Sequence, residues 1–253
     1  MTQSECDNFL EAVLNIGRAM VQSGAEIWRV EDALSRIFKS YQIPRAEIYT
    51  TTTLLIATIK TGDIIATQSV RIYKGVNNLG ALEKLNHLSR TICSQTPPTE
   101  QIQEMTAQAV RTVKKGGYHF IGYTMAAAAF TVFFGGDMAD SIVAGVIAAI
   151  VFVIEKYLNI KETNTLIYTL IMNFMNGSLA ILAVGLGLGH NVDKVIIGIV
   201  MLFIPALALV NGIKDMFYRD IHSGIFRVIE AVLIAAAIAL GIGLAMILWG
   251  GML

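Results

Sequence analysis

The sequence predicts a membrane protein, with a small cytoplasmic α+β domain over residues 1–115 and a bundle of about five transmembrane α-helices over residues 116–253. Hydrophobic residues make up 55% of the 253-residue chain, and its mean hydropathy is +0.61. Residues 1–115 hold 13 Lys and Arg and 11 Asp and Glu, whereas residues 116–253 hold only 6 and 8. The first part is therefore typical of a water-soluble domain and the second of a lipid-embedded one.

Five stretches of the second part are long and apolar enough to cross a bilayer, which takes about 20 mainly apolar residues. The third stretch contains no Asp, Glu, Lys or Arg. The second is the weakest, since Asp140, Glu155 and Lys156 must cap the helix or reach the membrane surface. The predicted transmembrane helices are 118–136, 138–158, 164–189, 195–213 and 226–250.

Basic residues in the connections between these helices set the predicted orientation. Cytoplasmic loops of membrane proteins carry an excess of Lys and Arg. Three basic residues closely precede the first helix, and the next four connections, counted with the adjoining helix ends, hold none, two, one and three. We therefore expect the N-terminus in the cytoplasm and, with an odd number of helices, the C-terminus outside.

Hydrophobic periodicity divides the first part into helices and strands. Apolar residues recur at helical spacing in four segments, and three other segments are rich in β-branched residues. Thr61-Gly62-Asp63 is typical of the turn between the second and third strands. The expected helices are 4–23, 25–41, 79–93 and 99–114, and the expected strands are 45–51, 53–60 and 65–73.

The first part lacks the sequence patterns of several other functions. The formal net charge is zero, which gives no indication of nucleic-acid binding. No Gly-rich phosphate loop, zinc-ligand spacing or nucleophile elbow is present, so we expect neither a cofactor nor a metal. A membrane-anchored enzyme would depend on His87 and Cys93, which lie six residues apart on roughly opposite faces of one predicted helix. Catalysis is therefore the weakest of the functional hypotheses.

The richest polar segment of the second part closes the fourth predicted helix and opens the fifth. Asn211, Asp215 and Arg219 are each four residues apart, so they share one face of a continuous helix. Arg227 and Glu230 are three apart on the next helix. Polar groups inside a membrane are costly and are functional candidates for that reason.

Three residues of this segment permit breaks in its helices, namely Pro205, Gly212 and Gly224. Broken helices beside polar residues form the sites for small charged solutes in many transporters. The alternative is a solvated cytoplasmic loop with paired charges, and the spacing alone favours neither.

Asn173 and Asn176 lie well inside the third predicted helix. Asn side chains often bond across membrane helices, so simple helix–helix packing is one interpretation. As site residues, the two amides would donate N–H groups to a carboxylate. Both interpretations stay open on the sequence.

Several motifs together follow a known pattern. They are Gly17, Ser23-Gly24-Ala25, Arg29-Val30-Glu31 and the threonine run 50–53, and then Pro205, Asn211-Gly212-Ile213, Asp215, Arg219-Asp220, Ser223-Gly224, Arg227 and an Ala-rich last helix. This pattern resembles the threonine/serine exporter family over nearly the whole chain. The chain departs from it at Tyr218-Arg219-Asp220, where full-length members carry Gly-Asp.

The resemblance implies export of small hydrophilic metabolites across the bacterial cytoplasmic (inner) membrane. Full-length members carry a second membrane half after the fifth helix. This chain therefore resembles the split, long-subunit type and is similar to the long subunit of a bacterial succinate exporter. The resemblance implies a small all-membrane partner subunit of about four or five helices.

The leading hypothesis is a subunit of a secondary exporter for threonine and serine or for a dicarboxylate such as succinate. No Walker motif indicates use of ATP, and the Gly- and Ala-rich helices also permit packing against a second copy. The alternative is a regulatory or scaffold subunit without its own transport path. The candidate site residues are Asn173, Asn176 and Asn211 for substrate, Asp215 and Glu230 for proton coupling, Arg219 or Arg227 for carboxylate attraction, and Asp220 beside them.

Overall fold

The computed structural model describes residues 1–110, 118–158 and 164–252, apart from 74 and 76, and it divides into two compact units. The first unit comprises the described residues up to 110 together with Leu207–Val228. The second unit comprises the remaining described residues. The first unit therefore includes a segment that lies more than 90 residues further along the chain.

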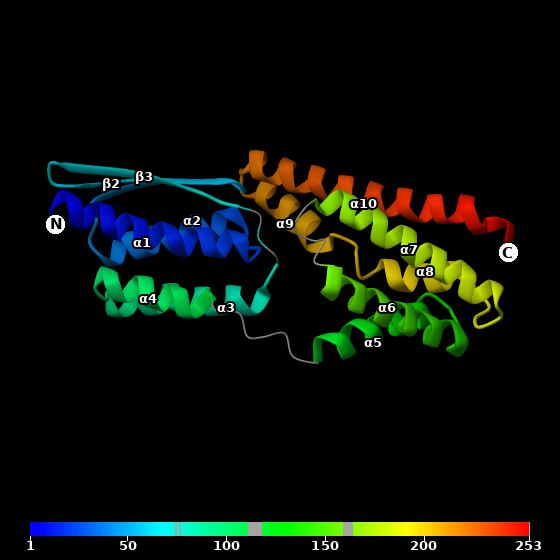
Figure 1. Cartoon of the computed structure of the whole chain (residues 1–253). Helices are drawn as coiled ribbons and strands as arrows, with labels where there is room; N and C mark the ends of the chain where they lie inside the picture. The colour runs from blue at the N-terminus through cyan, green and yellow to red at the C-terminus, as the bar shows by residue number, and fades with distance from the viewer. Residues whose placement is uncertain (74, 76, 111–117, 159–163, 253) are drawn as a thin grey trace. The chain divides into compact units, whose positions relative to one another are not determined.

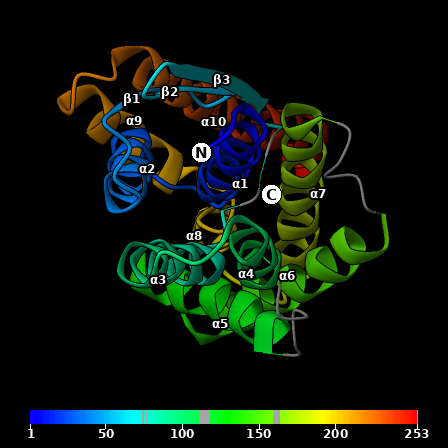
Figure 2. The ribbon, with the colours of Figure 1, turned by 90° about the vertical axis from the view of Figure 1, so that its left-hand side faces the viewer.

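The N-terminal part of the first unit has three layers (Figure 1). A three-stranded antiparallel sheet of order β1-β2-β3 covers helices α1 and α2 on one side, and α3 and α4 cover them on the other. Figure 2 shows the same layers from the end. These elements confirm the predicted small α+β fold. They are α1 (Gln3–Gln22), α2 (Ile27–Ser40), β1 (Arg45–Thr50), β2 (Leu54–Thr61), β3 (Ile64–Arg71), α3 (Leu79–Gln95) and α4 (Thr99–Val110).

Local chemistry explains where α1 begins and ends. Thr2 and Glu5 form a capping box, in which each side chain accepts the other residue's backbone N–H. The helix ends at Ser23, and Gly24 follows with φ of +95°, a backbone conformation that favours glycine. The chain then turns directly into α2.

The core of the first unit lies where α1 meets α2 and the sheet. Phe9 and Leu34 are almost fully buried there, and Leu55, Ala57 and Ile59 alternate inward from β2. Each fully buried side chain of this size contributes about 1.5–3 kcal/mol relative to its exposed state. This core holds the α1–α2 loop in place.

The second unit is helical. Three helices of the described chain are long and apolar enough to cross a membrane, over Met138–Lys156, Thr165–Gly185 and Ile221–Trp249. Helix α5 has 16 described residues, so the total of about five spans stays a prediction. The elements of this unit are α5 (Tyr118–Phe133), α6 (Met138–Leu158), α7 (Thr165–Gly185), α8 (Val192–Val200), most of α10 (Ile221–Trp249) and η2 (Gly250–Met252).

The structure differs from the single helix predicted over 195–213. Helix α8 ends at Val200, and α9 (Ala206–Phe217) begins directly after Pro205. Proline lacks a backbone N–H and its ring clashes with the preceding turn, so it is tolerated at a helix start and disrupts a helix interior. The expected breaks at Gly212 and Gly224 are wrong, because these residues lie inside α9 and α10.

Candidate functional site

Three polar side chains from α9 and the start of α10 bond to the α1–α2 loop inside the first unit. We call Asn211, Asp215 and Arg227 the latch. Two of its residues donate to backbone carbonyls of the loop, and the third accepts from a backbone N–H. The bonds are Asn211 Nδ2 to Gly24 O at 3.0 Å, Arg227 Nη2 to Ala25 O at 2.7 Å and Ile27 N to Asp215 Oδ1 at 3.0 Å.

Asp215 is the centre of the latch and is fully buried. Its Oδ2 lies 3.3 Å from Arg227 Nε, and its Oδ1 faces the N-terminus of α2, where the helix dipole favours negative charge. Burial nevertheless raises the pKa of Asp215 to about 6, because loss of water outweighs the attraction of Arg227 and the Ile27 N–H bond. The nearby Asp220 adds repulsion in the same direction. Asp215 therefore titrates close to neutral pH.

A second set of contacts surrounds the latch. The carboxylate of Glu26 is buried, and its two oxygens lie 3.2 Å from Lys214 Nζ and 3.2 Å from Arg29 Nε. Trp28 stacks on Tyr218 with ring centroids 4.3 Å apart. The sequence-based candidates did not include Glu26, Trp28 or Lys214, although Glu26 and Trp28 lie beside the Ser23-Gly24-Ala25 motif.

Arg219 does not continue the face that Asn211 and Asp215 share, because α9 ends at Phe217. Arg219 is exposed and has φ of +69°. Its N–H bonds Met216 O, and the N–H of Asp220 bonds Asp215 O, which is the Schellman pattern of a helix end. Asp220 then caps α10 by accepting from the Ser223 N–H. Arg219 and Asp220 thus shape the turn between α9 and α10.

Gly212 and Gly224 allow α9 and α10 to approach closely. A Cβ added to Gly212 would lie 2.9 Å from Gly224 O, and one added to Gly224 would lie 2.6 Å from Gly212 O. Such distances exclude any side chain without a shift of the backbone. The two glycines therefore place Asp215 and Arg227, on neighbouring helices, within reach of each other.

The second unit contains a separate pair of buried amides. Asn173 and Asn176 of α7 are fully or almost fully buried. Asn173 Nδ2 donates to Thr169 O of its own helix. Among the residues that the structure describes, none pairs with Asn173 Oδ1 or with either polar atom of the Asn176 amide. Buried polar groups without partners are costly, so such a pair indicates a place for water or a polar solute.

Helix α10 packs directly against this part of α7. A Cβ added to Gly241 would lie 2.5 Å from Leu170 O and 3.2 Å from Asn173 Cβ. One added to Gly177 would lie 2.9 Å from Ala245 Cβ. Small residues thus bring the backbone of α10 against the turn of α7 that carries Asn173. Glu230, the last sequence-based candidate, is an exposed residue of α10 in the same unit.

A second polar cluster of this unit joins the start of α6 to the loop before α8. Asp140 is buried and accepts the backbone N–H groups of His190 and Asn191 at 2.7 and 3.0 Å. The His190 ring bonds Asp137, and this bond raises the pKa of His190. One atom from each of Asp137, Asp140 and His190 lies within 4.8 Å of the others, so the group could hold a metal ion. The hydrogen bonds to Asp140 already give the cluster a structural role, because they hold the loop before α8 against the start of α6.

Glu155 has a partner that sequence reasoning missed. The Tyr168 hydroxyl of α7 donates to the Glu155 carboxylate of α6. The sequence predicted only a capping or surface position for this acid. The pattern that could have revealed the pair is a tyrosine and a carboxylate at similar depth in two apolar helices.

The fold and the buried amides together define a class of protein. Helices of membrane-spanning length that enclose polar groups without protein partners are typical of integral membrane proteins that move polar solutes. The model of the ThrE family, described as threonine/serine exporter, matches residues 11–249, and the chain belongs to this family. No curated protein and no solved structure shows significant similarity to the chain. The match confirms the family resemblance and favours transport over catalysis.

Proposed function

We propose that the chain is a subunit of a secondary exporter that moves small polar metabolites out of the bacterial cytoplasm. Threonine and serine are the leading substrates because of the family to which the chain belongs. A dicarboxylate such as succinate is the alternative. The observation that carries the proposal is the buried amide pair, Asn173 and Asn176, inside the apolar helix α7.

The amide pair suits a carboxylate-bearing solute. Asn176 has two N–H donors and a carbonyl oxygen without partners among the described residues, and Asn173 has a free carbonyl oxygen. Donors bind a carboxylate, and acceptors bind the ammonium or hydroxyl group of an amino acid. Burial in an apolar helix strengthens each such hydrogen bond. In our proposal the solute binds here during alternating access.

The latch has a different proposed role. Asn211, Asp215 and Arg227 are engaged by the α1–α2 loop and are not free to bind a solute in this state. We assign them to coupling between the N-terminal part of the first unit and the α9–α10 hairpin. Asp215 is the leading candidate for proton coupling, because its pKa of about 6 permits titration near neutral pH. Glu230 is the second candidate.

The proposed membrane arrangement follows the loop charges. About five spans in the inner membrane would place the N-terminus in the cytoplasm and the C-terminus outside. We propose a small all-membrane partner subunit, since split members of the family consist of two chains. The glycine-rich faces of the helices would also accept a second copy.

A regulatory or scaffold subunit is the second candidate function. The latch favours it, because three of the candidate site residues bond the α1–α2 loop. The two functions differ in what the amide pair should do. If the chain is an exporter, efflux depends on Asn173 and Asn176. If it is a scaffold, efflux depends on the latch and not on the amide pair.

The test is efflux from cells that co-express the chain with its small membrane partner. Cells are loaded with labelled threonine, serine or succinate, and the double variant Asn173→Ala/Asn176→Ala is compared with Ser178→Ala. Ser178 is a matched control, since it is a polar residue of α7 whose hydroxyl bonds Phe174 O of the same helix. At equal membrane abundance, we expect the efflux rate of the double variant to fall about tenfold or more, because two hydrogen bonds to the solute are lost. Normal efflux in the double variant, with loss in Asp215→Asn, would instead favour the scaffold.

A further inference from the structure

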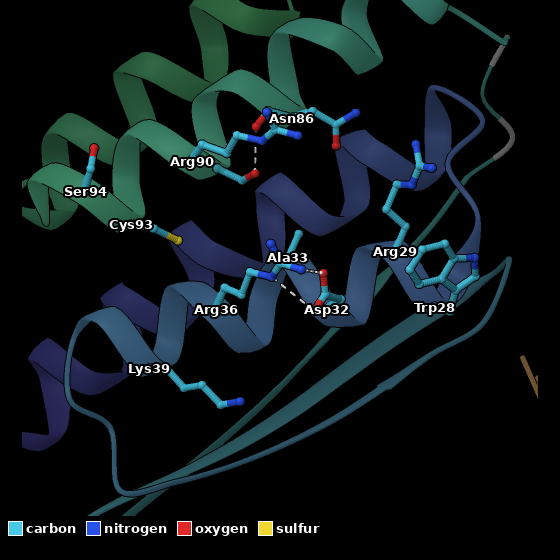
Figure 3. Close-up of a pocket in the computed structure, with 11 residues that line it drawn as sticks. Trp28, Arg29, Asp32, Ala33, Arg36, Lys39, Asn86, Arg90, Cys93 and Ser94 are labelled. Atoms are coloured by element: carbon cyan, nitrogen blue, oxygen red, sulfur yellow. Dashed lines mark hydrogen bonds and ion pairs between the residues drawn. The ribbon is translucent and has the colours of Figure 1, made fainter.

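A cleft of about 710 Å³ lies in the first unit between α2 and α3 (Figure 3). Its lining comes from both helices, with six residues of α2 and five of α3. Buried Ala33 lines it with a small side chain. The volume falls within the range of about 300–1,000 Å³ that is typical of small-molecule sites.

The charges that line the cleft are strongly unbalanced. Four cationic side chains line it, namely Arg29, Arg36, Lys39 and Arg90, and Asp32 is its single acid. The whole chain, in contrast, has 19 basic and 19 acidic residues. Such a concentration of one sign in a concave surface attracts ligands of the opposite sign.

Two of the four cations have no internal partner in the described chain. Asp32 is bidentate to Arg36, with the shorter contact at 2.6 Å, and Arg29 lies 3.2 Å from Glu26. Lys39 and Arg90 form no ion pair with any residue that the structure describes. Both line the cleft, one from α2 and the other from α3, so both are available to an anionic ligand there.

The donor set of the cleft matches phosphate. Guanidinium groups bind phosphate with two parallel N–H bonds, and a lysine adds a compact positive charge. The amide of Asn86 supplies a neutral donor at the same surface. We propose that this cleft binds a phosphorylated small molecule. The cleft belongs to the first unit and the buried amide pair to the second, so the two proposed sites use different residues.

Residues of the cleft also contact α9, through Glu26, and the turn after it, beside the latch. Arg29 lines the cleft and pairs with Glu26, whose other oxygen pairs with Lys214 of α9. Trp28 also lines the cleft and stacks on Tyr218 beyond the end of α9. A phosphate that draws Arg29 away from Glu26 would alter the contacts of α9. The site is therefore placed to regulate the protein, and Trp28 is placed to report occupancy.

The test measures binding by Trp28 fluorescence in the full chain. Trp249 is the second of the two tryptophans and is removed by Trp249→Phe. The protein is placed in phosphatidylcholine nanodiscs and titrated with ADP and with inorganic pyrophosphate, and adenosine serves as the uncharged control. The double variant Lys39→Gln/Arg90→Gln is compared with Lys60→Gln/Arg71→Gln, which removes two exposed cations of the sheet.

We expect ADP and pyrophosphate to bind and adenosine not to bind. The Lys39/Arg90 variant should weaken the affinity about tenfold or more, and the Lys60/Arg71 variant should leave it within about twofold. A parallel series in discs with phosphatidylglycerol distinguishes a lipid phosphate as the source. In that case the anionic lipid shifts the Trp28 signal and competes with ADP, and both effects disappear in the Lys39/Arg90 variant. Absence of a response to any phosphate, or equal affinity in the two double variants, would overturn the proposal.

Discussion

The Nε of Arg227 lies 3.3 Å from Oδ2 of Asp215, and both residues are buried in the first unit. Each also bonds the backbone of the α1–α2 loop, about 190 to 200 residues earlier in the chain. A charge pair that is buried and hydrogen-bonded on both sides is strongly destabilised when one partner is removed. The pair therefore joins α9 and the start of α10 to the rest of the first unit.

Arg227→Met should lower the free energy of unfolding of the first unit by about 3–5 kcal/mol, because it leaves Asp215 buried without its countercharge. The double variant with Asp215→Asn should be less destabilised than the sum of the two single variants. Unfolding of the full chain, followed by Trp28 fluorescence in the Trp249→Phe background, measures this coupling.

The matched control for this cycle is Arg36 with Asp32, a bidentate pair whose side chains are 66% and 44% exposed. Exposed pairs contribute about 0–1 kcal/mol, so Arg36→Met should have a small effect. Equal costs for the buried and exposed pairs would contradict the role of the latch.

The stability of the first unit should fall as pH rises from about 4 to about 6. The pKa of Asp215 is raised from 3.8 to about 6. In this window the folded state keeps a proton that the unfolded chain has released, so unfolding becomes easier as pH increases and then levels off above about 6. Asp215→Asn should remove this contribution. A difference between wild type and Asp215→Asn that does not change between pH 4 and 6 would show that Asp215 does not titrate there.

Arg219→Gly should stabilise the first unit by about 0.5–1 kcal/mol, because glycine adopts the left-handed conformation at no steric cost. Arg219→Lys should have no such effect, since it keeps a Cβ at φ of +69°. Thermal unfolding measures both. We also expect unchanged efflux in Arg219→Gly. A loss of efflux would instead indicate that Arg219 attracts the carboxylate of the solute.

Gly241→Ala should destabilise the second unit by about 1–3 kcal/mol, as overpacking does. Its Cβ would lie 2.5 Å from Leu170 O and 2.9 Å from Phe174 N, both backbone atoms of α7. Gly243→Ala is the control, because its Cβ meets nothing within 4 Å. Thermal unfolding in detergent compares the two, and equal midpoints would mean that α7 and α10 do not pack as described.

The local elements of the first unit could be predicted because each depends on neighbouring residues. The periodicity of apolar residues marks α1 and α2, and β-branched runs marked the three strands to within two residues. Hydropathy likewise indicated the three helices of membrane-spanning length. Pro205 was among the residues expected to permit a helix break, and α8 and α9 are separate helices on either side of it.

The latch could not be predicted from the sequence. Asn211 and Arg227 donate to the backbone carbonyls of Gly24 and Ala25. Because every residue has a backbone carbonyl, nothing in the sequence marks these two as the acceptors. The family resemblance pointed to both segments but not to their meeting. The basic cleft could not be predicted for a similar reason, because Lys39 and Arg90 line one cleft only after α2 and α3 have packed.

The central proposal is that this chain, together with the proposed partner subunit, exports a small polar solute. The most direct measurement is counterflow of labelled threonine, serine and succinate in proteoliposomes that contain both subunits. We predict solute-specific exchange above that of empty liposomes, and its loss with Asn173→Ala/Asn176→Ala but not with Ser178→Ala. Assembled subunits that exchange none of the three solutes faster than empty liposomes would contradict the claim.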